Sequence, residues 1–464
     1  MKKLLVFASV IFLTGCMVGP KYHRPPASVP KVFRGQSPPT VPASKAESLG
    51  NQKWWQVFKD PVLDKLIRTG IAQNYNIRIA ATRVMQAQDS LGITRGNQFP
   101  FVSAGAGLLT EKNPKTSKVF PAYEVNSGHL NLSVIWNLDF WGKYRRETQA
   151  AHAELLASEW GQRAVVSSVV ASVASAYFQL RALDSQLVIA KRTLATRQDS
   201  LRLIRVLQKH GSRSMLDVTQ AEQLVDAAAG TIPSLEREIE QQENAIRLLL
   251  GENPGPIPRG LTITKQLEPP AVPTGLPSQL LERRPDVHEA IENLIAANAN
   301  IGAAKAEMFP SISLTGTGGF ESYALNRFIS APSKMWNGAV DLTQPIFQAG
   351  AIRYGISLTK AQWQQMVLTY QQTVQDAFEQ VSNALIGYNK DRQFTRQQRR
   401  LTQAAKQSDH LSMVLYHNGG ASYLQVLTSE TNYFAAELNL VQADLNERLS
   451  LVQVYQALGG GWQQ

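Results

Sequence analysis

Side chains that commonly take part in catalysis or metal binding are few in this sequence, and they form no recognisable motif. Two of the seven histidines, His410 and His417, lie about two helical turns apart, and imidazole is a common zinc ligand. Two histidines at this spacing without a third ligand are typical of surface residues. The sequence contains no phosphate-binding loop, dinucleotide fingerprint, nucleophile elbow or zinc motif. We therefore predict that the protein is not an enzyme and binds no metal or cofactor.

Cys16 is the one residue whose surroundings predict a covalent modification. The chain starts with a basic Met1-Lys2-Lys3, continues with an apolar run from Leu4 to Leu13, and reaches Thr14-Gly15-Cys16. This order is typical of a signal peptide over residues 1–15, because the apolar run is shorter than the roughly 20 residues of a membrane-spanning helix. The Leu-Thr-Gly-Cys tetrad resembles the bacterial lipobox, which implies cleavage before Cys16 and attachment of a diacylglycerol and an N-acyl chain. An ordinary signal peptide with an incidental cysteine is the alternative.

The composition narrows the possible partners. Cys16 is the only cysteine, so an internal disulfide is excluded. Met17 follows it where Asp could stand, which in lipoproteins of this kind implies delivery to the outer membrane. The formal net charge of +11 becomes +9 once Lys2 and Lys3 leave with the signal peptide, and an exported basic protein rarely meets nucleic acid. The densest basic cluster, which we expect to be a solvated helix face, consists of Arg392, Arg396, Arg399 and Arg400.

Four segments alternate apolar and polar residues with the period of a β-strand. They lie at about 99–110, 129–140, 309–320 and 336–347. Lengths near ten residues suit strands that cross an outer membrane, and the polar linkers between the members of each pair suit external loops. A soluble β-sandwich would give the same alternation, although four strands make a poor sandwich. Because a membrane barrel needs about eight strands and tolerates no open edge, we predict that three copies combine to form twelve strands.

Two other segments have the apolar spacing of long helices packed on helices. The first predicted hairpin covers residues 143–250 and turns near Gly211, and the second covers 350–458 and turns near Gly419. The first helix of the first hairpin, ending near residue 209, would be roughly 100 Å long. Gly230 and Pro233 predict a kink or a break in the second helix of that hairpin.

The chain is an internal duplication. Residues 76–251 and 286–459 run in the same order of helix, strand pair, very long helix and helix. The repeat spacing is 210 residues up to the first strand of each half, as between Phe99 and Phe309, and 208 residues from Gly142 and Gly350 onward. Residues 16–75, 252–285 and 460–464 fall outside the repeats. A rod or adhesin stalk would explain the helices but not two strand pairs at equivalent points.

Five segments resemble a known family, the outer membrane efflux proteins, and specifically the TolC-like, NodT-type lipoproteins of RND multidrug pumps. These segments are Trp54–Pro61, Leu138–Lys143, Arg283–Val287, Phe309–Gly316 and Pro345–Phe347. The resemblance covers nearly the whole mature chain.

The resemblance implies an α+β membrane protein that forms a homotrimer. Each copy would contribute four strands to a twelve-stranded outer-membrane β-barrel and long helices to a twelve-helix periplasmic α-barrel. Residues 16–75, 252–285 and the C-terminal tail would form a small mixed equatorial domain. The implied function is the exit duct of a tripartite, proton-driven efflux pump, with a periplasmic adaptor and an inner-membrane transporter as partners. Another cargo, such as a secreted protein or a metal ion, is the main alternative, and a non-channel lipoprotein is a third.

The resemblance further implies that the hairpin tips carry the function. Adaptor docking is expected at Gly211, Ser214, Gly419 and Ser422, and the periplasmic aperture gate at Arg213, Asp217, Tyr416 and Gln425. In this sequence Gln425 and Thr428 stand where the family often has carboxylates, and only Asp217 keeps one. The alternative is that the glycines and serines only turn the chain and Asp217 only caps a helix.

Overall fold

The structure is a computed structural model that describes residues 17–35, 48–112, 124–265, 272, 277–323 and 328–462. Cys16 and the signal peptide lie outside these residues. The described residues fall into two compact units. Unit 1 contains Arg83–Glu159, Glu289–Gln371 and the residues before Ala27, and unit 2 contains Ala27–Thr82, Trp160–His288 and the residues from Gln372 onward. Each unit therefore draws on both repeats.

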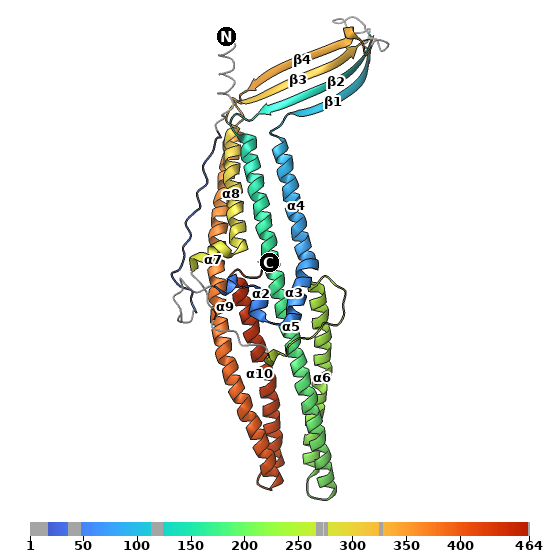
Figure 1. The fold of residues 1–464 in the computed structure, drawn as a ribbon, viewed down its shortest axis with the longest axis vertical. Helices are drawn as coiled ribbons and strands as arrows, with labels where there is room; N and C mark the ends of the chain where they lie inside the picture. Colours follow the sequence, from blue (N-terminus) through green and yellow to red (C-terminus); the bar gives the residue numbers. More distant parts are fainter. Residues whose placement is uncertain are drawn as a thin grey trace. The chain divides into compact units, whose positions relative to one another are not determined.

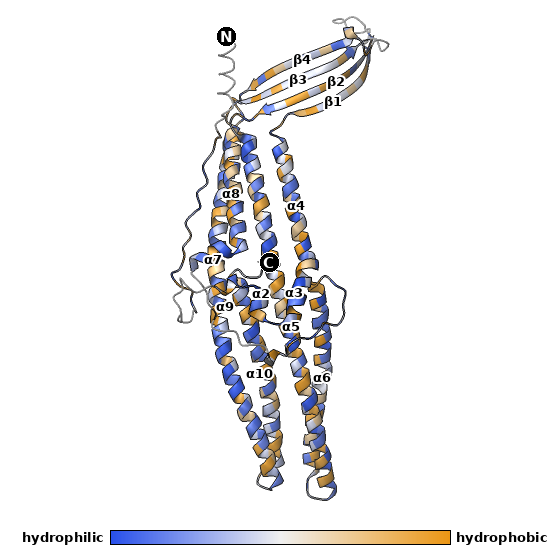
Figure 2. Ribbon diagram, in the orientation of Figure 1, coloured by the Kyte–Doolittle hydropathy of each residue, from blue (hydrophilic) through white to orange (hydrophobic). Residues whose placement is uncertain are grey.

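Unit 1 holds an antiparallel sheet of four strands (Figure 1). The strands are β1 (Phe101–Lys112), β2 (Glu124–Leu138), β3 (Ser311–Ser322) and β4 (Lys334–Thr343), in the order β1-β2-β3-β4. Hydrophobic and hydrophilic residues are interspersed along all four strands (Figure 2). Large apolar side chains remain exposed in the single chain, such as Leu108 at 76% and Val340 at 71%. The four predicted strands are therefore present, and the sheet leaves apolar surface uncovered.

The strand boundaries differ from the predicted ones for local reasons. β1 and β3 start two residues later, because the amides of Phe99 and Phe309 still close the turns that end the preceding helices, and a proline follows each. β2 starts at Glu124 because it pairs with β1 as far as Lys112. Its predicted end at residue 140 is also wrong, since Asp139 caps the next helix by accepting from the backbone N–H groups of residues 144 and 145 at 3.1 and 2.9 Å.

β4 ends at Thr343 and not at the predicted residue 347. Pro345 has no backbone N–H to donate. Ala349 and Gly350 then adopt positive φ angles of 48° and 86°, which turn the chain into the following helix.

The helices of the two repeats correspond in length. α4 (Tyr75–Gly96) and α8 (Pro285–Ala306) have 22 residues each. α5 (Lys143–Lys209) and α9 (Ala351–His417) have 67 each, and α6 (Met215–Leu249) and α10 (Tyr423–Ala457) have 35 each. By length and composition α5 could cross a membrane, but 56% of its most apolar window is buried within the protein. The equal lengths confirm the duplication.

Of the expected kink or break in α6, the break is absent, because α6 is one helix that contains Pro233. A proline inside a helix removes one hydrogen bond and costs roughly 3 kcal/mol. Ala228 and Ile239, on either side of Pro233, are buried. We attribute the continuity of α6 to this packing, which stabilises the helix on both sides of the proline.

Short helices occupy the segments outside the repeats. They are η1 (Leu49–Asn51), α2 (Trp54–Phe58), α3 (Pro61–Gln73), η2 (Ile263–Lys265) and α7 (Pro277–Arg283), while η4 (Ala331–Ser333) precedes β4. Asp60 caps α3 by accepting from the Val62 amide at 2.9 Å. The buried Tyr177 hydroxyl donates to the Asp60 carboxylate at 3.1 Å and accepts from the Gly260 amide at 2.9 Å. These contacts connect the segment before α4, through Asp60, and the segment after α6, through Gly260, to α5.

In each repeat a side chain just before the 22-residue helix donates a hydrogen bond to a carbonyl at the end of the 35-residue helix. In repeat 1 the Asn74 side chain donates to the Leu249 carbonyl at 2.7 Å while it caps α4. In repeat 2 the equivalent residue, Arg284, donates to the Ala457 carbonyl at 3.0 Å and pairs with Asp286. Both side chains satisfy a carbonyl at the end of a 35-residue helix, which would otherwise lack a partner. This contact explains part of the Arg283–Val287 motif.

The basic cluster on α9 is not the uniformly solvated face that we expected. Arg399 forms an ion pair with Asp444 at 3.0 Å, and Arg392 lies 3.8 Å from Glu447. Both carboxylates belong to α10 and are only 4% exposed. A buried carboxylate is costly unless it is paired, so these two arginines stabilise the packing of α9 against α10.

Candidate functional site

Both hairpins end in the same turn at their tips. Gly211 and Gly419 each have a φ of 74°, a conformation that side-chain-bearing residues rarely adopt. The amides of Ser212 and Gly420 donate back to carbonyls at the ends of α5 and α9, at 2.9 and 2.8 Å. A methyl group placed on either glycine would meet no described atom within 4 Å, so the backbone angle requires glycine and the packing does not.

The predicted docking serines and two of the predicted gate residues pair with each other. Ser214 accepts from the Asp217 amide at 3.2 Å, and the Asp217 carboxylate accepts from the Ser214 amide at 3.1 Å. Ser422 and Gln425 form the same reciprocal pair at 3.3 and 3.1 Å. These capping boxes begin α6 and α10. Capping needs an acceptor but no charge, which explains why Gln425 can replace a carboxylate here.

The other two predicted gate residues also contact each other. The Arg213 guanidinium lies 4.5 Å from the centre of the Tyr416 ring, and this contact joins the first tip to the second. Tyr416 is only 6% exposed, and burial raises the pKa of its hydroxyl, with Arg213 opposing the shift. In a single copy Tyr416 therefore lies inside the tip and not on its surface.

Tyr416 belongs to a hydrophobic cluster between the two hairpins, which we call the tip cluster. Its buried members are Leu201, Ile204, Val218, Ala221, Tyr416, Tyr423, Val426 and Leu427. The rings of Tyr416 and Tyr423 lie 5.5 Å apart. Sequence reasoning did not single out Tyr423, although its place one residue after the Ser422 cap offered a signal. The tip cluster holds the two hairpins together within one copy.

A groove of about 710 Å³ lies between α9 and α10 beside the second tip. Its lining includes Ser422 and Gln425 and the exposed side chains of Leu411, Leu415 and Leu424. Three half-exposed leucines with a polar margin form the kind of surface that binds an amphipathic partner helix. The groove therefore extends the predicted docking surface beyond the turn residues.

A small cavity of about 130 Å³ between α5, α9 and α10 carries an unusual set of charges, and we call it the carboxylate cavity. Asp409, Glu430 and Glu437 line it together with Arg192 and Arg197. Glu437 pairs with Arg192, and Arg197 donates to the Leu224 carbonyl at 2.8 Å.

One oxygen of Glu430 and one of Asp409 are buried in this region without a hydrogen-bond partner among the described residues. Burial, with a smaller contribution from the Asp409 charge, raises the pKa of Glu430 to about 7. The pKa of Asp409 is also raised, mainly by burial. Sequence reasoning missed the cavity, because its residues come from three helices that are far apart in the chain.

Cys16 lies outside the described residues. His410 and His417 lie on α9, and the described part of the chain contains no group of three ligands that could hold a metal ion.

Comparisons with known proteins agree with the geometry. A sequence model described as "Outer membrane efflux protein" matches twice, at residues 66–252 and 276–460, which are the two repeats. The chain is 35% identical to the "Cation efflux system protein CusC" of Escherichia coli O6:H1, covering 100% of this chain and 99% of that protein. It is also 35% identical to the "Probable efflux pump outer membrane protein TtgC" of Pseudomonas putida, covering 99% and 96%. The solved structure of the outer-membrane channel OprN has a TM-score of 0.88 at 28% identity, covering 97% and 100%.

Proposed function

We propose, from the premise that this chain belongs to the outer membrane efflux protein family, that it is the exit duct of a proton-driven tripartite pump that expels drugs and other small toxic compounds. The observation that carries the proposal is the match of the family to both repeats, each of which combines a strand pair with a long helical hairpin. The protein is an outer membrane efflux channel. Its role is conduction, and the proposal assigns it no catalytic step.

The proposed assembly is a homotrimer. One chain supplies a sheet whose outer strands, β1 and β4, have one unpaired edge each among the described residues, and an unpaired edge is not tolerated in the hydrocarbon region of a membrane. Four strands are also too few for a membrane barrel. Three copies would give twelve strands, enough for an open channel. The proposed trimer thus follows from what the sheet lacks.

The hairpin tips are the proposed periplasmic end of the duct. The groove beside Ser422, together with the turns at Gly211 and Gly419, offers an adaptor both exposed leucines and backbone groups. We assign docking to Gly211, Ser214, Gly419 and Ser422. The contact between Arg213 and Tyr416 holds the two tips of one copy together, so a gate would open by separating them.

The gate set also includes Asp217 and Gln425. Asp217 is the only carboxylate at the tip turns themselves, and in a trimer it would form a ring of three charges. Gln425 contributes a neutral acceptor at the equivalent position of the second tip. We propose that Asp217 sets the ion preference of the aperture.

The chain is further proposed to carry a lipid on Cys16. The described residues immediately after it are held in place, because the Val18 amide donates to the Trp141 carbonyl at 3.1 Å and Arg146 donates to the Val18 carbonyl at 3.0 Å. These contacts keep the start of the mature chain beside the connection between β2 and α5. An acyl anchor at Cys16 would therefore lie close to the sheet that enters the membrane.

The cargo is tested by a susceptibility profile. Cells with the gene deleted would be compared with cells that also carry a wild-type or a Cys16→Ala copy, across dyes, antibiotics, copper and silver. Sensitivity to dyes and antibiotics that the wild-type copy reverses supports drug efflux, and sensitivity only to the metals supports the alternative suggested by the 35% identity to CusC. If the deletion changes sensitivity to neither the dyes and antibiotics nor the metals, the proposal is contradicted. The Cys16 variant measures the contribution of the lipid.

A further inference from the structure

The sheet continues into the long helices through two equivalent connections. Residues 139–142 join β2 to α5, and residues 344–350 join β4 to α9. β1 pairs with β2 from Phe101↔Ile135 onward, and β3 pairs with β4 from Ser311↔Thr343 onward, which are equivalent positions at spacings of 210 and 208 residues. Both connections therefore leave the same end of the sheet, and a difference between them indicates a difference in their partners.

The two connections carry the same cation but not the same anion. In repeat 1 Arg145 pairs with the Asp139 carboxylate, with Nε and Oδ2 3.2 Å apart. At a spacing of 208 residues the equivalents in repeat 2 are Arg353 and Phe347. Arg353 is exposed and has no ion pair or hydrogen bond within the described residues. Repeat 2 thus presents the guanidinium of repeat 1 without its internal carboxylate.

The two connections also differ in what covers them. A methyl group placed on Gly142 in repeat 1 would lie 2.8 Å from the side chain of Met17, the residue that follows Cys16. In repeat 1 the chain itself would therefore bring the proposed lipid to this place. A methyl group on the equivalent Gly350 would meet, among the described residues apart from its chain neighbours, only the Tyr354 ring within 4 Å. The described chain provides no such cover for repeat 2.

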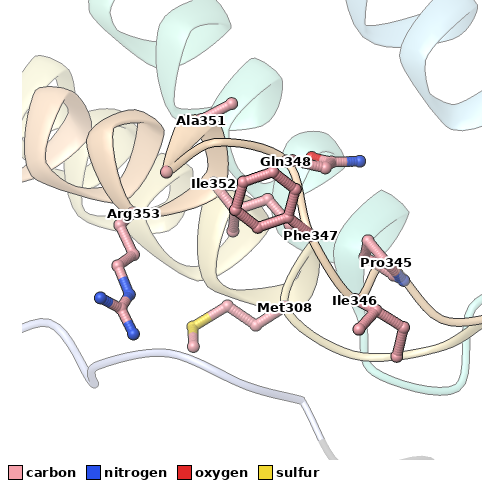
Figure 3. A pocket seen from close by; sticks show the side chains of 9 residues that line it. Met308, Pro345, Ile346, Phe347, Gln348, Ala351, Ile352 and Arg353 are labelled. Carbon is pink, nitrogen blue, oxygen red and sulfur yellow. The ribbon is translucent and has the colours of Figure 1, made fainter.

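A pocket of about 410 Å³ lies at this uncovered connection (Figure 3). Its lining combines the apolar side chains of Met308, Phe347 and Ile352 with the polar side chains of Gln348 and Arg353. Among the described residues, no carboxylate lines it. Phe347 is 86% exposed in the single chain, which is unfavourable for a ring of this size unless a partner covers it. The pocket therefore suits a ligand that has both an anionic group and an apolar part.

We infer that this pocket, with Arg353, binds the phosphate group of an anionic phospholipid in the membrane leaflet that faces the periplasm. The pocket lies where β4 has ended and α9 begins, which is the level of the lipid headgroups when the strands span the hydrocarbon region. A guanidinium can donate two parallel hydrogen bonds to phosphate oxygens. The inference rests on the outer membrane location of the protein and is independent of its cargo.

The acyl chains of such a lipid would follow an apolar surface. Val340 and Leu342 lie on one face of β4 and are exposed, and Ile346, just after the strand, is 89% exposed. Inorganic phosphate would pair with Arg353 but leave these side chains uncovered. A phospholipid supplies the anion and the apolar chains together, so we assign it as the occupant.

Native mass measurement of the purified protein in a mild detergent with phosphatidylglycerol tests the site. The wild type should retain one phosphatidylglycerol per copy that Arg353→Gln loses or binds about tenfold more weakly. Arg353→Lys keeps the charge but not the planar fork and should be intermediate. Arg396→Gln removes another exposed arginine of α9 and is the matched control, which should retain the lipid. Equal retention by Arg353→Gln and Arg396→Gln would overturn the site.

A second pair of variants supplies the missing anion from the chain itself. Phe347→Asp gives repeat 2 the carboxylate that pairs with Arg145 in repeat 1, so it should compete with the lipid phosphate for Arg353. Phe347→Asn removes the same ring without adding a charge, and it should retain several-fold more phosphatidylglycerol than Phe347→Asp. Equal retention by these two variants would show that Arg353 does not hold the phosphate, which contradicts the inference.

Competition distinguishes a phospholipid from free phosphate. An excess of inorganic phosphate should release no more lipid than chloride at equal ionic strength, whereas selective release would identify a phosphate site and overturn the lipid assignment. The susceptibility profile of the deletion strain judges the proposed function separately. Retained lipid with an unchanged profile would refute only the exit duct, and a profile that the wild-type copy restores, without retained lipid, would refute only the lipid site.

Discussion

Neutralising Glu430 should strengthen the contact between α5, α9 and α10 just above the hairpin tips. Glu430 has one buried oxygen without a hydrogen-bond partner among the described residues, and it lines the carboxylate cavity with Asp409, Glu437, Arg192 and Arg197. In Glu430→Gln the shape of the side chain is kept while its charge is lost. The variant therefore isolates the electrostatic cost of the ionised form.

The magnitude follows from the pKa of Glu430, which burial raises from 4.5 to about 7. One pKa unit corresponds to about 1.4 kcal/mol, and partial access of water to the cavity reduces the effect, so we expect a penalty of roughly 2 kcal/mol. Below pH 4.5 the carboxyl is protonated in both the folded and the unfolded state, and the penalty is absent. It grows between pH 4.5 and about 7 and is complete above that range, so the stability of this contact falls as the pH rises.

Hydrogen exchange of the backbone amides of α9 and α10 around the cavity measures this effect. At about pH 8 these amides should exchange about thirtyfold more slowly in Glu430→Gln than in the wild type, and at about pH 4.5 the two proteins should be alike. Glu240→Gln, at an exposed position of α6, is the matched control and should change nothing. Equal exchange of wild type and Glu430→Gln at the higher pH would refute the reasoning.

Three further predictions concern the hairpin tips and the contact that Arg284 makes with the end of α10. Asp217→Asn keeps an acceptor for the Ser214 cap but removes the charge, so single-channel recordings should show a weaker cation preference; unchanged selectivity would place the filter elsewhere. Ile204→Ala opens a cavity in the tip cluster and should destabilise the tip by about 2 to 4 kcal/mol, seen as faster amide exchange there and not at the sheet. Arg284→Ala removes the donor to the buried Ala457 carbonyl and one partner of Asp286, and should cost about 2 kcal/mol, while Arg284→Gln should cost less; equal protection of the end of α10 in all three proteins would contradict this role.

Much of the fold could be predicted from the sequence, because the period of the strands and the period of the long helices are both strong and both occur in each repeat. The duplication fixed the order of elements, and the glycines at 211 and 419 located both tips. One error arose where tertiary contacts outweigh local preference. Pro233 should interrupt a helix locally, yet α6 continues because its neighbouring residues are buried. The predicted end of β4 was wrong for a local reason, because Pro345 has no backbone N–H to donate and the strand ends before it at Thr343.

The candidate site was predictable only in part. The pairing of Ser214 with Asp217, and of Ser422 with Gln425, follows the capping-box spacing and could be read as helix starts. The burial of Tyr416 and the three-helix cavity around Glu430 depend on which faces of distant helices meet. A single sequence does not specify which helix faces pack together, since the same heptad pattern suits several helix partners.

The most direct test of the central claim is the rate at which preloaded cells lose a fluorescent dye when their energy supply is restored. Cells without the gene would be compared with cells carrying the wild-type copy and with cells carrying an equally expressed Val340→Pro copy, in which β4 loses one backbone N–H donor to the sheet. An exit duct predicts fast loss only with the wild-type copy. Equal loss from all three strains would contradict the conclusion that this chain conducts drugs across the outer membrane.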